Sequence, residues 1–358
     1  MTSHDGIVHH PLGAGSYYFK TSLIRYLNDQ CDHSPIVIHI GYQPNCSPHI
    51  GNIVTFAVGF AIAAAIKADF NRDVRVKFVL VDTAPSPTET TIIEGVKYQR
   101  SLQHTGAVKE NIKPLTQILA RLSELAEIPF DLETQDIWRS NPRFLPTLQK
   151  IISRRDILGP HLSPETGKLA IRAPCPDCGL ADKHALNNQY HDNESIQLRC
   201  HIHGKYTIDL TLQSDLNRLE FNTPLRNLIR ILLCSADRSH SWIMVTGSDY
   251  AGFYQDQLLW KHIEHRDSAP VIFYAPLILD WSGVKLSKSL YVKDGAYQYL
   301  VDAGQGYLLN GEKFHRIEGA MEALFEEVSE WVEKPFMLFR SYSVEYLDGR
   351  LRERGMRV

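Results

Sequence analysis

The chain has 358 residues, of which 44% are hydrophobic and 22% charged, the balance of a globular protein with a large buried core and two or three structural units. A formal net charge of −3 excludes a global basic field for nucleic acid, although it leaves room for a local basic patch. Six cysteines, three of them in one short region, exclude a secreted disulfide framework, and no stretch resembles a signal peptide. We therefore predict a cytoplasmic protein.

The first part of the chain predicts a Rossmann-like α/β sheet. Residues 1–34 form an expected N-terminal helical adaptor, with the amphipathic run "SYYFKTSLIRYL". The apolar runs 35–42 and 74–82 are predicted strands that flank an apolar helix over 53–66, which we expect to be a buried core helix because it is too short to cross a bilayer. A strand–helix–strand order with apolar strands is typical of a parallel sheet covered on both faces.

The rest of the chain predicts an insertion and a second half of the same sheet. Residues 83–90 are an expected loop at the carboxyl end of the second strand, where open α/β sheets bind ligands. Residues 106–157 are mostly helical, strands are expected within 241–249 and 270–280, and residues 253–263 are an expected helix. The predicted units are a first Rossmann-like half, a zinc-ribbon insertion, a second half with a lysine loop and a short helical C-terminal part, at residues 35–157, 158–222, 223–295 and 296–358.

Four residues of the insertion predict a structural zinc site. Cys175 and Cys178 form one knuckle, and Cys200 and His203 form a second, each followed directly by a glycine. Two-residue spacing lets both ligands of a knuckle face one tetrahedral ion, and four protein ligands leave no open position for catalysis. His201 is the alternative fourth ligand, although His203 has the two-residue spacing.

Two further segments suggest a nucleotide site. "HIGN" (49–52) opens the apolar helix, whose first N–H groups and positive dipole end make an anion site suited to a triphosphate. His49 is also explained by a helix cap alone. "GVKLSKS" (283–289) follows the later strand, and its Lys285 and Lys288 would neutralise charge developing on a phosphoryl group, unless this is an ordinary solvated loop.

Together these segments resemble the two signatures of class I aminoacyl-tRNA synthetases, usually written HIGH and KMSKS. "TGSD" (246–249) resembles the family's glycine-and-aspartate stretch that contacts the ribose and the aminoacyl group. With the Cys/His insertion, the set most resembles the archaeal-type class I lysyl-tRNA synthetases, and the likeness covers roughly residues 35–295.

The resemblance implies a role for each motif residue. His49, Gly51 and Asn52 would bind ATP or the terminal adenosine of tRNA, Lys285, Ser287 and Lys288 would contact phosphates, and Gly247 and Asp249 would border the ribose and the amino-acid ammonium group. Mg²⁺ would accompany ATP. The family chemistry is attack of a carboxylate on the α-phosphate, followed by acyl transfer to the tRNA end, and it depends on positioning and charge neutralisation.

Three departures from the family point to activity outside translation. Leu290, Tyr291 and Val292 stand where a glycine normally follows the lysine motif and would stiffen the loop, and Tyr250 ends the aspartate motif in place of a histidine or glutamine. Residues 313–358 are expected to be too short for an anticodon-binding domain. We therefore predict an enzyme that forms peptide bonds from aminoacyl-tRNA, as cyclodipeptide synthases do, including the fungal arginine-containing ones. The alternatives are ATP-dependent adenylation with transfer to tRNA or a small acceptor, a non-catalytic tRNA-binding pseudo-synthetase, and a ligase that acts without tRNA.

Charged residues supply the remaining predictions. Tyr42, Asp82 and Glu89 are candidates for the substrate pocket, and the two carboxylates favour a basic amino acid such as Arg. Two basic groups are candidates for tRNA phosphate contacts, although solvated helical faces explain them equally well: Arg139, Arg143, Lys150, Arg154 and Arg155, and Arg350, Arg352, Arg354 and Arg357. Oligomeric state does not follow from the sequence.

Overall fold

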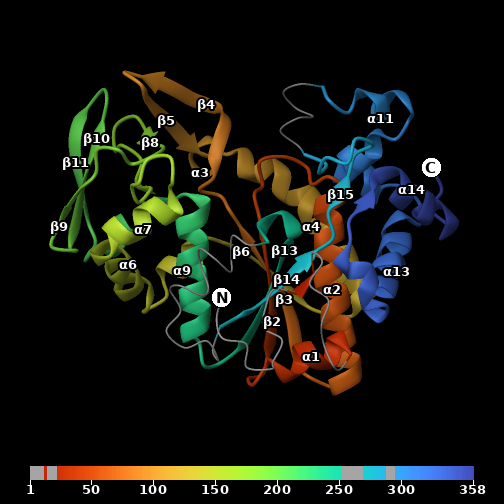
Figure 1. The fold of residues 1–358 in the computed structure, drawn as a ribbon. Coiled ribbons are helices and arrows are strands. Elements are labelled where there is room, and N and C mark those ends of the chain that lie inside the picture. The colour runs from red at the N-terminus through yellow and green to blue at the C-terminus, as the bar shows by residue number, and fades with distance from the viewer. Residues whose placement is uncertain (1–11, 14–21, 252–268, 288–294) are drawn as a thin grey trace.

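The centre of the fold is a parallel β-sheet, as predicted. The structure is a computed structural model that describes residues 12–13, 22–251, 269–287 and 295–358 (Figure 1). Six strands lie in the order β1-β14-β13-β2-β3-β6, and every neighbouring pair is parallel. Their bounds are β1 Leu12–Gly13, β2 Ile36–Tyr42, β3 Val74–Leu80, β6 Phe130–Thr134, β13 Ser241–Gly247 and β14 Val271–Ala275.

The two faces of the sheet have separate hydrophobic cores. Alternate residues of β2 such as Ile38 and Ile40 pack on α2 (Ile50–Phe70), α4 (Ala107–Ala126) and α13 (Ala320–Glu333). On the opposite face, Met244 of β13 and Ile272 of β14 pack with α9 (Thr223–Ala236) and α6 (Phe144–Ser153). Figure 1 shows α9 on one side of the sheet and α2 and α13 on the other. Parallel strands buried on both faces explain why their sequences read as continuous apolar runs.

The strand order reverses direction between β2 and β13. From β2 the chain proceeds outward to β3 and β6, then returns and continues through β13 to β14 on the other side. Open α/β sheets bind ligands at the carboxyl ends of the strands that flank such a reversal. The fold therefore places the expected site beside the ends of β2 and β13.

Helix α2 is longer than the sequence suggested, yet it is a core helix. It has 21 residues and is apolar enough to cross a membrane by length and composition. Twelve of its residues are buried, and it packs between the sheet and α13, α4 and α1 (Leu23–Asp29). α1 contributes Leu23 and Leu27 to this core, which fits the described part of the predicted N-terminal adaptor.

Two predicted segments differ from the structure. Residues 83–90 were expected to be a loop, but most of them belong to β4 (Pro85–Ile93), which forms a hairpin with β5 (Val96–Ser101). The prolines of this segment favoured a loop, whereas an edge strand tolerates proline. The helical prediction for 106–157 missed β6, an edge strand of mostly polar residues. The predicted helix at 253–263 lies outside the described residues.

The segment between β6 and β13 contains several short elements around the second core. An antiparallel three-stranded sheet, β11-β10-β9, lies beside the β4–β5 hairpin, which β8 extends through pairing with β5. The bounds are α3 Leu102–Thr105, α5 Asp136–Arg139, α7 Arg155–Leu162, β7 Ile171–Arg172, β8 Ala181–Asp182, β9 Gln189–His191, β10 Ser195–Cys200, β11 Gly204–Asp209, α8 Gln213–Leu216 and β12 Glu220–Phe221.

The C-terminal part is mainly helical, as predicted. α13 packs along α2, and the two-residue strand β16 pairs with β15 beside the lysine loop. The bounds are β15 Ile278–Leu279, α11 Gln298–Asp302, α12 Gly311–His315, β16 Tyr342–Ser343 and α14 Val344–Glu353, with 3₁₀ turns at Gly306–Leu309 and Pro335–Phe339.

Candidate functional site

A cavity of about 400 Å³ lies at the carboxyl ends of β2 and β13. Its lining comes from these strand ends, the start of α2, the loop after β15 and one face of α9. The cavity therefore occupies the point where the strand order reverses, as the general rule for open α/β sheets predicts.

The three predicted motifs meet in this cavity. Its lining includes these residues of the predicted set: Tyr42, His49, Gly51, Asn52, Gly247, Asp249, Lys285 and Ser287. A Cβ atom at Gly51 would lie 3.7 Å from Cβ of Ile278, so the helix start and the strand before the lysine loop are in direct proximity. Lys288 lies outside the described residues, as do Leu290, Tyr291 and Val292 of the predicted stiff loop. The binding roles of these residues remain predictions.

His49 is the N-cap of α2. Its Nδ1 accepts a hydrogen bond from the Gly51 N–H at 3.1 Å, and its own N–H donates to Asn52 Oδ1 at 3.2 Å. A Cβ atom at Gly51 would lie 3.0 Å from the imidazole Cε1, so glycine leaves the space that the ring needs. Because Nδ1 accepts this bond, the neutral form of the ring carries its proton on Nε2.

The cap changes the expected anion site. The N–H groups of Asn52 and Ile53 both donate to the His49 carbonyl, and the Gly51 N–H donates to the His49 ring. These first-turn donors were expected to hold a triphosphate. Two of the first-turn donors, the Gly51 and Asn52 N–H groups, are therefore bonded within the helix start itself, while the Ile53 bond is the ordinary helical one, and the triphosphate site remains a prediction.

The lysine loop is fixed at its first turn by Asp280. Oδ1 of Asp280 accepts from the Ser282 N–H, the Ser282 hydroxyl and the Val284 N–H at 2.9, 2.6 and 3.1 Å. The loop then returns to β15, where the Leu286 N–H donates to the Ile278 carbonyl at 2.8 Å. Asp280 is not among the predicted site residues, although an aspartate two residues before a serine is typical of this kind of turn.

Lys285 extends from this turn to the aspartate motif. Its Nζ lies 2.5 Å from Oδ2 of Asp249, with side chains that are 44% and 32% exposed. The pair joins the two motifs at the more open part of the cavity. A carboxylate and an ammonium group are thus placed side by side in the lining of the cavity.

One wall of the cavity consists of residues outside the predicted set. Arg226, Asn227 and Arg230 of α9 line it, each at most 7% exposed, and His39 of β2 lines it at 3%. A Cβ atom at Gly41 would lie 3.0 Å from Nη1 of Arg230, so this guanidinium occupies the space above Gly41. Burial, and then the nearby Arg230 charge, keeps the pKa of His39 well below its usual range, so the ring is neutral.

The predicted substrate carboxylates do not line the cavity. Asp82 is buried beside α3, where its carbonyl accepts from the Gln103 N–H. Glu89 lies on the β4–β5 hairpin and pairs with Arg100 at 2.9 Å. These two assignments are therefore corrected, because β3 ends one strand away from the reversal. Tyr42 does line the cavity, and its hydroxyl donates to the Cys46 carbonyl at 2.8 Å.

Some residues of the first group of predicted phosphate contacts are held by other parts of the protein, and others are exposed. Arg139 is 4% exposed and donates to the Asn217 and Leu219 carbonyls at 2.7 and 2.6 Å, so it has a structural role and not the predicted one. Arg143 bonds the Ala236 carbonyl, and Arg155 bonds the Ile152 carbonyl and lies over the Tyr190 ring. Lys150 is exposed and Arg154 partly so, and their contact with phosphate remains a prediction.

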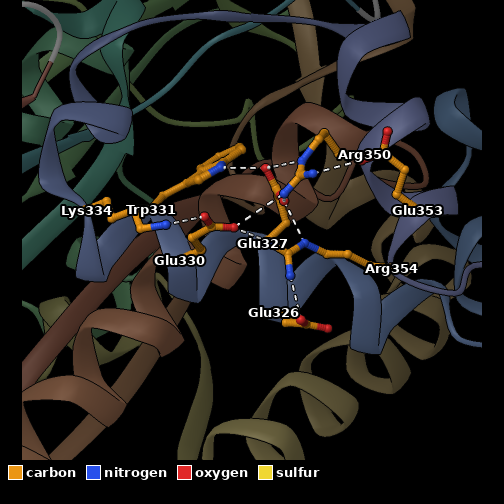
Figure 2. A network of polar contacts seen from close by, with 8 residues as sticks. All are labelled: Glu326, Glu327, Glu330, Trp331, Lys334, Arg350, Glu353 and Arg354. Atoms are coloured by element: carbon orange, nitrogen blue, oxygen red, sulfur yellow. Dashed lines mark hydrogen bonds and ion pairs between the residues drawn. The ribbon is translucent and has the colours of Figure 1, made fainter.

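The C-terminal arginines form a network with carboxylates of α13. Figure 2 shows Glu327, fully buried, between Arg350 and Arg354, whose guanidinium groups lie 3.1 and 2.6 Å from it. Arg352 pairs with Asp348 at 2.9 Å, and Arg357 pairs with Glu318 at 3.1 Å. The predicted basic patch is corrected, since acidic partners offset these charges.

The predicted zinc ligands form one cluster. The Sγ atoms of Cys175, Cys178 and Cys200 and one ring nitrogen of His203 all lie within 4.8 Å of one another. Three of the separations are 3.5, 3.6 and 3.7 Å, close to the edges of about 3.6–3.8 Å that a tetrahedron with Zn–S bonds of about 2.3 Å requires. His201 lies instead beside Glu94, so His203 is the fourth member, and the residues fit the ion.

Comparisons with known proteins find no matching family model and no matching curated protein. Solved structures similar to this chain include an arginyl-tRNA synthetase from Campylobacter jejuni, at 9% identity and a TM-score of 0.33, over 92% of this chain and 88% of that one. Thermus thermophilus arginyl-tRNA synthetase matches at 12% identity and a TM-score of 0.36, over 89% of this chain and 61% of that one. Glutamate–tRNA synthetase from Elizabethkingia anophelis matches at 13% identity and a TM-score of 0.32, over 73% of this chain and 54% of that one.

These TM-scores are too low for a shared activity to follow from the likeness. The expected relationship to lysyl-tRNA synthetases and to cyclodipeptide synthases stays a prediction.

Proposed function

We propose that the protein is a class I synthetase-like enzyme that takes an aminoacyl group from charged tRNA and transfers it to an amine, forming a peptide bond. The observation that carries this proposal is the meeting of three segments distant in sequence, "HIGN", "TGSD" and the lysine loop, around one cavity at the reversal of the strand order. Each motif alone has an ordinary structural explanation, whereas their convergence on one cavity is what a nucleotide and aminoacyl site requires.

The proposed step needs no nucleotide hydrolysis. The attacking amine forms a C–N bond to the acyl carbon, the ester C–O bond to the terminal ribose breaks, and the ribose hydroxyl leaves with the proton that the amine loses. Asp249 would hold the ammonium group or ribose hydroxyl of the donor, and the Nε2–H of His49 would donate to oxygen that gains charge. Lys285 would bind the terminal phosphate of the tRNA.

The protein groups that could bind phosphate favour charged tRNA over ATP as the donor. The Gly51 and Asn52 N–H groups at the start of α2 are already bonded to His49, and Lys285 pairs with Asp249. A triphosphate needs several such groups at once, while a single phosphodiester at the tRNA end needs fewer. ATP-dependent adenylation with Mg²⁺ is the second candidate, and in both candidates the substrate must release Lys285 from Asp249.

One experiment separates the candidates. The purified protein is incubated with a full set of charged tRNAs without ATP, and in parallel with ATP, amino acids and uncharged tRNA, and the products are identified by mass spectrometry. A dipeptide or diketopiperazine from charged tRNA alone, lost in Asp249→Asn, is the expected result. Product that forms only with ATP would overturn the proposal in favour of adenylation, and tRNA binding without any product would indicate a non-catalytic module.

A further inference from the structure

His39 places a buried hydrogen-bond acceptor at the inner wall of the cavity. It lines the cavity, it is 3% exposed, and its Nε2 has no hydrogen-bond partner among the residues that the structure describes. Burial, and then the charge of Arg230, keeps the pKa of His39 well below its usual range, so the ring is neutral and carries one proton. The ring donates that proton to the backbone of its own residue, which leaves Nε2 as an acceptor.

Neighbouring side chains do not supply the missing donor. The indole N–H of Trp242, whose ring centroid lies 6.4 Å from that of His39, donates to Asp237 at 2.9 Å. Lys77 on the adjacent strand pairs with Glu133 at 2.9 Å. A buried polar atom without a partner is unfavourable, so a group that enters the cavity is expected to satisfy this nitrogen. That group must donate a hydrogen bond, which an ionised carboxylate cannot do.

Asn227 of α9 adds a donor to the same wall. It is 4% exposed, it lines the cavity, and its Oδ1 accepts a hydrogen bond from Arg230 Nη2 at 2.9 Å. A guanidinium group only donates, so this contact fixes the amide with its oxygen toward Arg230. Among the residues that the structure describes, no other hydrogen bond engages the Asn227 side chain, which leaves its NH₂ group to donate to a ligand.

The charges around His39 disfavour a cationic ligand group. After burial, the charges of Arg230 and Lys77 both lower the pKa of His39. A positive group bonded to Nε2 would meet the same burial and the same two charges that keep the imidazole itself neutral. Lysine and arginine side chains are therefore disfavoured here, although both can donate. Carboxamide and hydroxyl groups remain, because each is neutral, can donate to His39 and can accept from Asn227.

We infer that His39 and Asn227 recognise a neutral side chain that both donates and accepts a hydrogen bond, so that the aminoacyl group taken by the site carries a carboxamide or a hydroxyl. This inference rests on the proposed function and replaces the basic amino acid expected from Asp82 and Glu89. His39 acts here on the choice of substrate and takes no part in the transfer of the acyl group. A buried acceptor discriminates against a substrate of the same shape that lacks the donor, because the acceptor is then left unpaired.

The test compares charged tRNAs whose aminoacyl groups differ in this one feature. Initial rates of product formation are measured with pairs of similar shape, tyrosyl with phenylalanyl, threonyl with valyl and glutaminyl with glutamyl, and with lysyl and arginyl groups. We expect the wild type to prefer the neutral donating member of at least one pair by about tenfold or more. His39→Phe, which removes the acceptor and keeps a ring, should abolish this preference, and His39→Gln, whose amide can present an acceptor, should keep part of it. The matched control His191→Phe, at an exposed position of β9, should leave it unchanged.

The wild type alone can overturn the inference, so the result does not depend on the folding of a variant. A preference for lysyl, arginyl or glutamyl groups, for the phenylalanyl and valyl members, or for no member of any pair would overturn it and leave the proposed function standing. An equal preference in the wild type and His39→Phe would do the same, because His39 would then hold a water molecule or serve the fold alone.

Nitrogen NMR of the wild type with isotope-labelled histidine gives a readout that is independent of the reaction. The Nε2 signal of His39, identified by its loss in His39→Gln, should have the position of an unprotonated nitrogen. It should shift on addition of at least one of free tyrosine, threonine and glutamine, and not with phenylalanine, valine or glutamate. Such a shift without product from any charged tRNA would support the recognition and overturn the proposed function. A protonated Nε2, or a signal that none of these amino acids moves, would overturn the inference.

Discussion

The two roles of His49 can be separated by substitution. Its Nδ1 caps α2 through the Gly51 N–H at 3.1 Å, while Nε2 carries the proton that we assign to chemistry. Asparagine is among the best N-cap residues and its amide oxygen reaches the same N–H groups, whereas alanine offers no acceptor. His49→Asn therefore restores the cap without the imidazole, and His49→Ala removes both.

The expected magnitudes follow from these contacts. Loss of one side-chain cap costs about 1 kcal/mol of unfolding free energy, so His49→Ala should shift the urea midpoint downward by that amount at unchanged slope, and His49→Asn should lie about 0.5 kcal/mol or less from the wild type. Removal of a donor to developing charge costs about 10²–10³ in rate. We therefore expect both variants to lose about this factor in kcat/KM for the acyl-transfer reaction, although only one of them is less stable.

The result that contradicts this reasoning is a fully active His49→Asn protein. In that case the imidazole is a cap and nothing more, and the position of the motif in the cavity reflects helix geometry alone. Gly51→Ala gives a second check, because its new Cβ would lie 3.0 Å from the His49 ring and displace it. Activity should fall in this variant too.

Three further predictions concern the metal cluster, the C-terminal network and pH. Cys200→Ser should abolish stoichiometric zinc in metal analysis of the purified protein, while His201→Ala keeps it; equal zinc loss in both would contradict the assigned ligand set. Glu327→Gln should lower the unfolding free energy in urea by about 2 kcal/mol, because it leaves two guanidinium groups around a neutral amide, whereas Glu353→Gln at the exposed end changes it by about 0.5 kcal/mol or less. Burial raises the pKa of Asp237, but the hydrogen bonds that its carboxylate accepts from residues 239, 240 and 242 outweigh burial and lower this pKa to about 2. Its stabilisation is therefore complete above the ordinary pKa of about 4 and is lost as the pH falls toward 2. Asp237→Asn should be about 1–2 kcal/mol less stable than the wild type at pH 7, after allowance for partial exposure, and this difference should shrink at pH 3 in urea titrations.

The sequence predicted the parts of the fold whose residues carry a local signal. The strands β2, β3, β13 and β14 are apolar runs, and α2 is an apolar segment behind a turn, so periodicity and composition were sufficient. The strands β4 and β6 were missed because an edge strand is held by pairing with a neighbour and needs little apolar surface. Their own residues, with prolines in one and acids in the other, favour loops.

The position of charged residues is harder to predict, because a charged residue in a predicted helix is usually on the solvent-exposed face. In "TPLRNLIRILL" the two arginines of α9 have the spacing of an ordinary exposed face, and only the packing of α9 against the end of β2 shows that they line a cavity. The C-terminal arginines show the opposite error. Their sequence predicts a basic patch, but in the structure α14 packs beside the carboxylates of α13, which pair with these arginines (Figure 2).

One rule of α/β sheets was applied to the wrong strand. Ligands bind at the carboxyl ends of parallel strands, and the sequence analysis used this rule for Asp82 after β3, whereas "HIGN" after β2 and "TGSD" after β13, assigned from the helix start and the family resemblance, line the cavity. The rule applies to the strands that flank the reversal of order, and β3 lies one strand beyond it. Strand order depends on long-range pairing that no single segment encodes. The charge of the substrate pocket was therefore assigned from a strand end that does not line the cavity, whereas the arginines of α9 do line it.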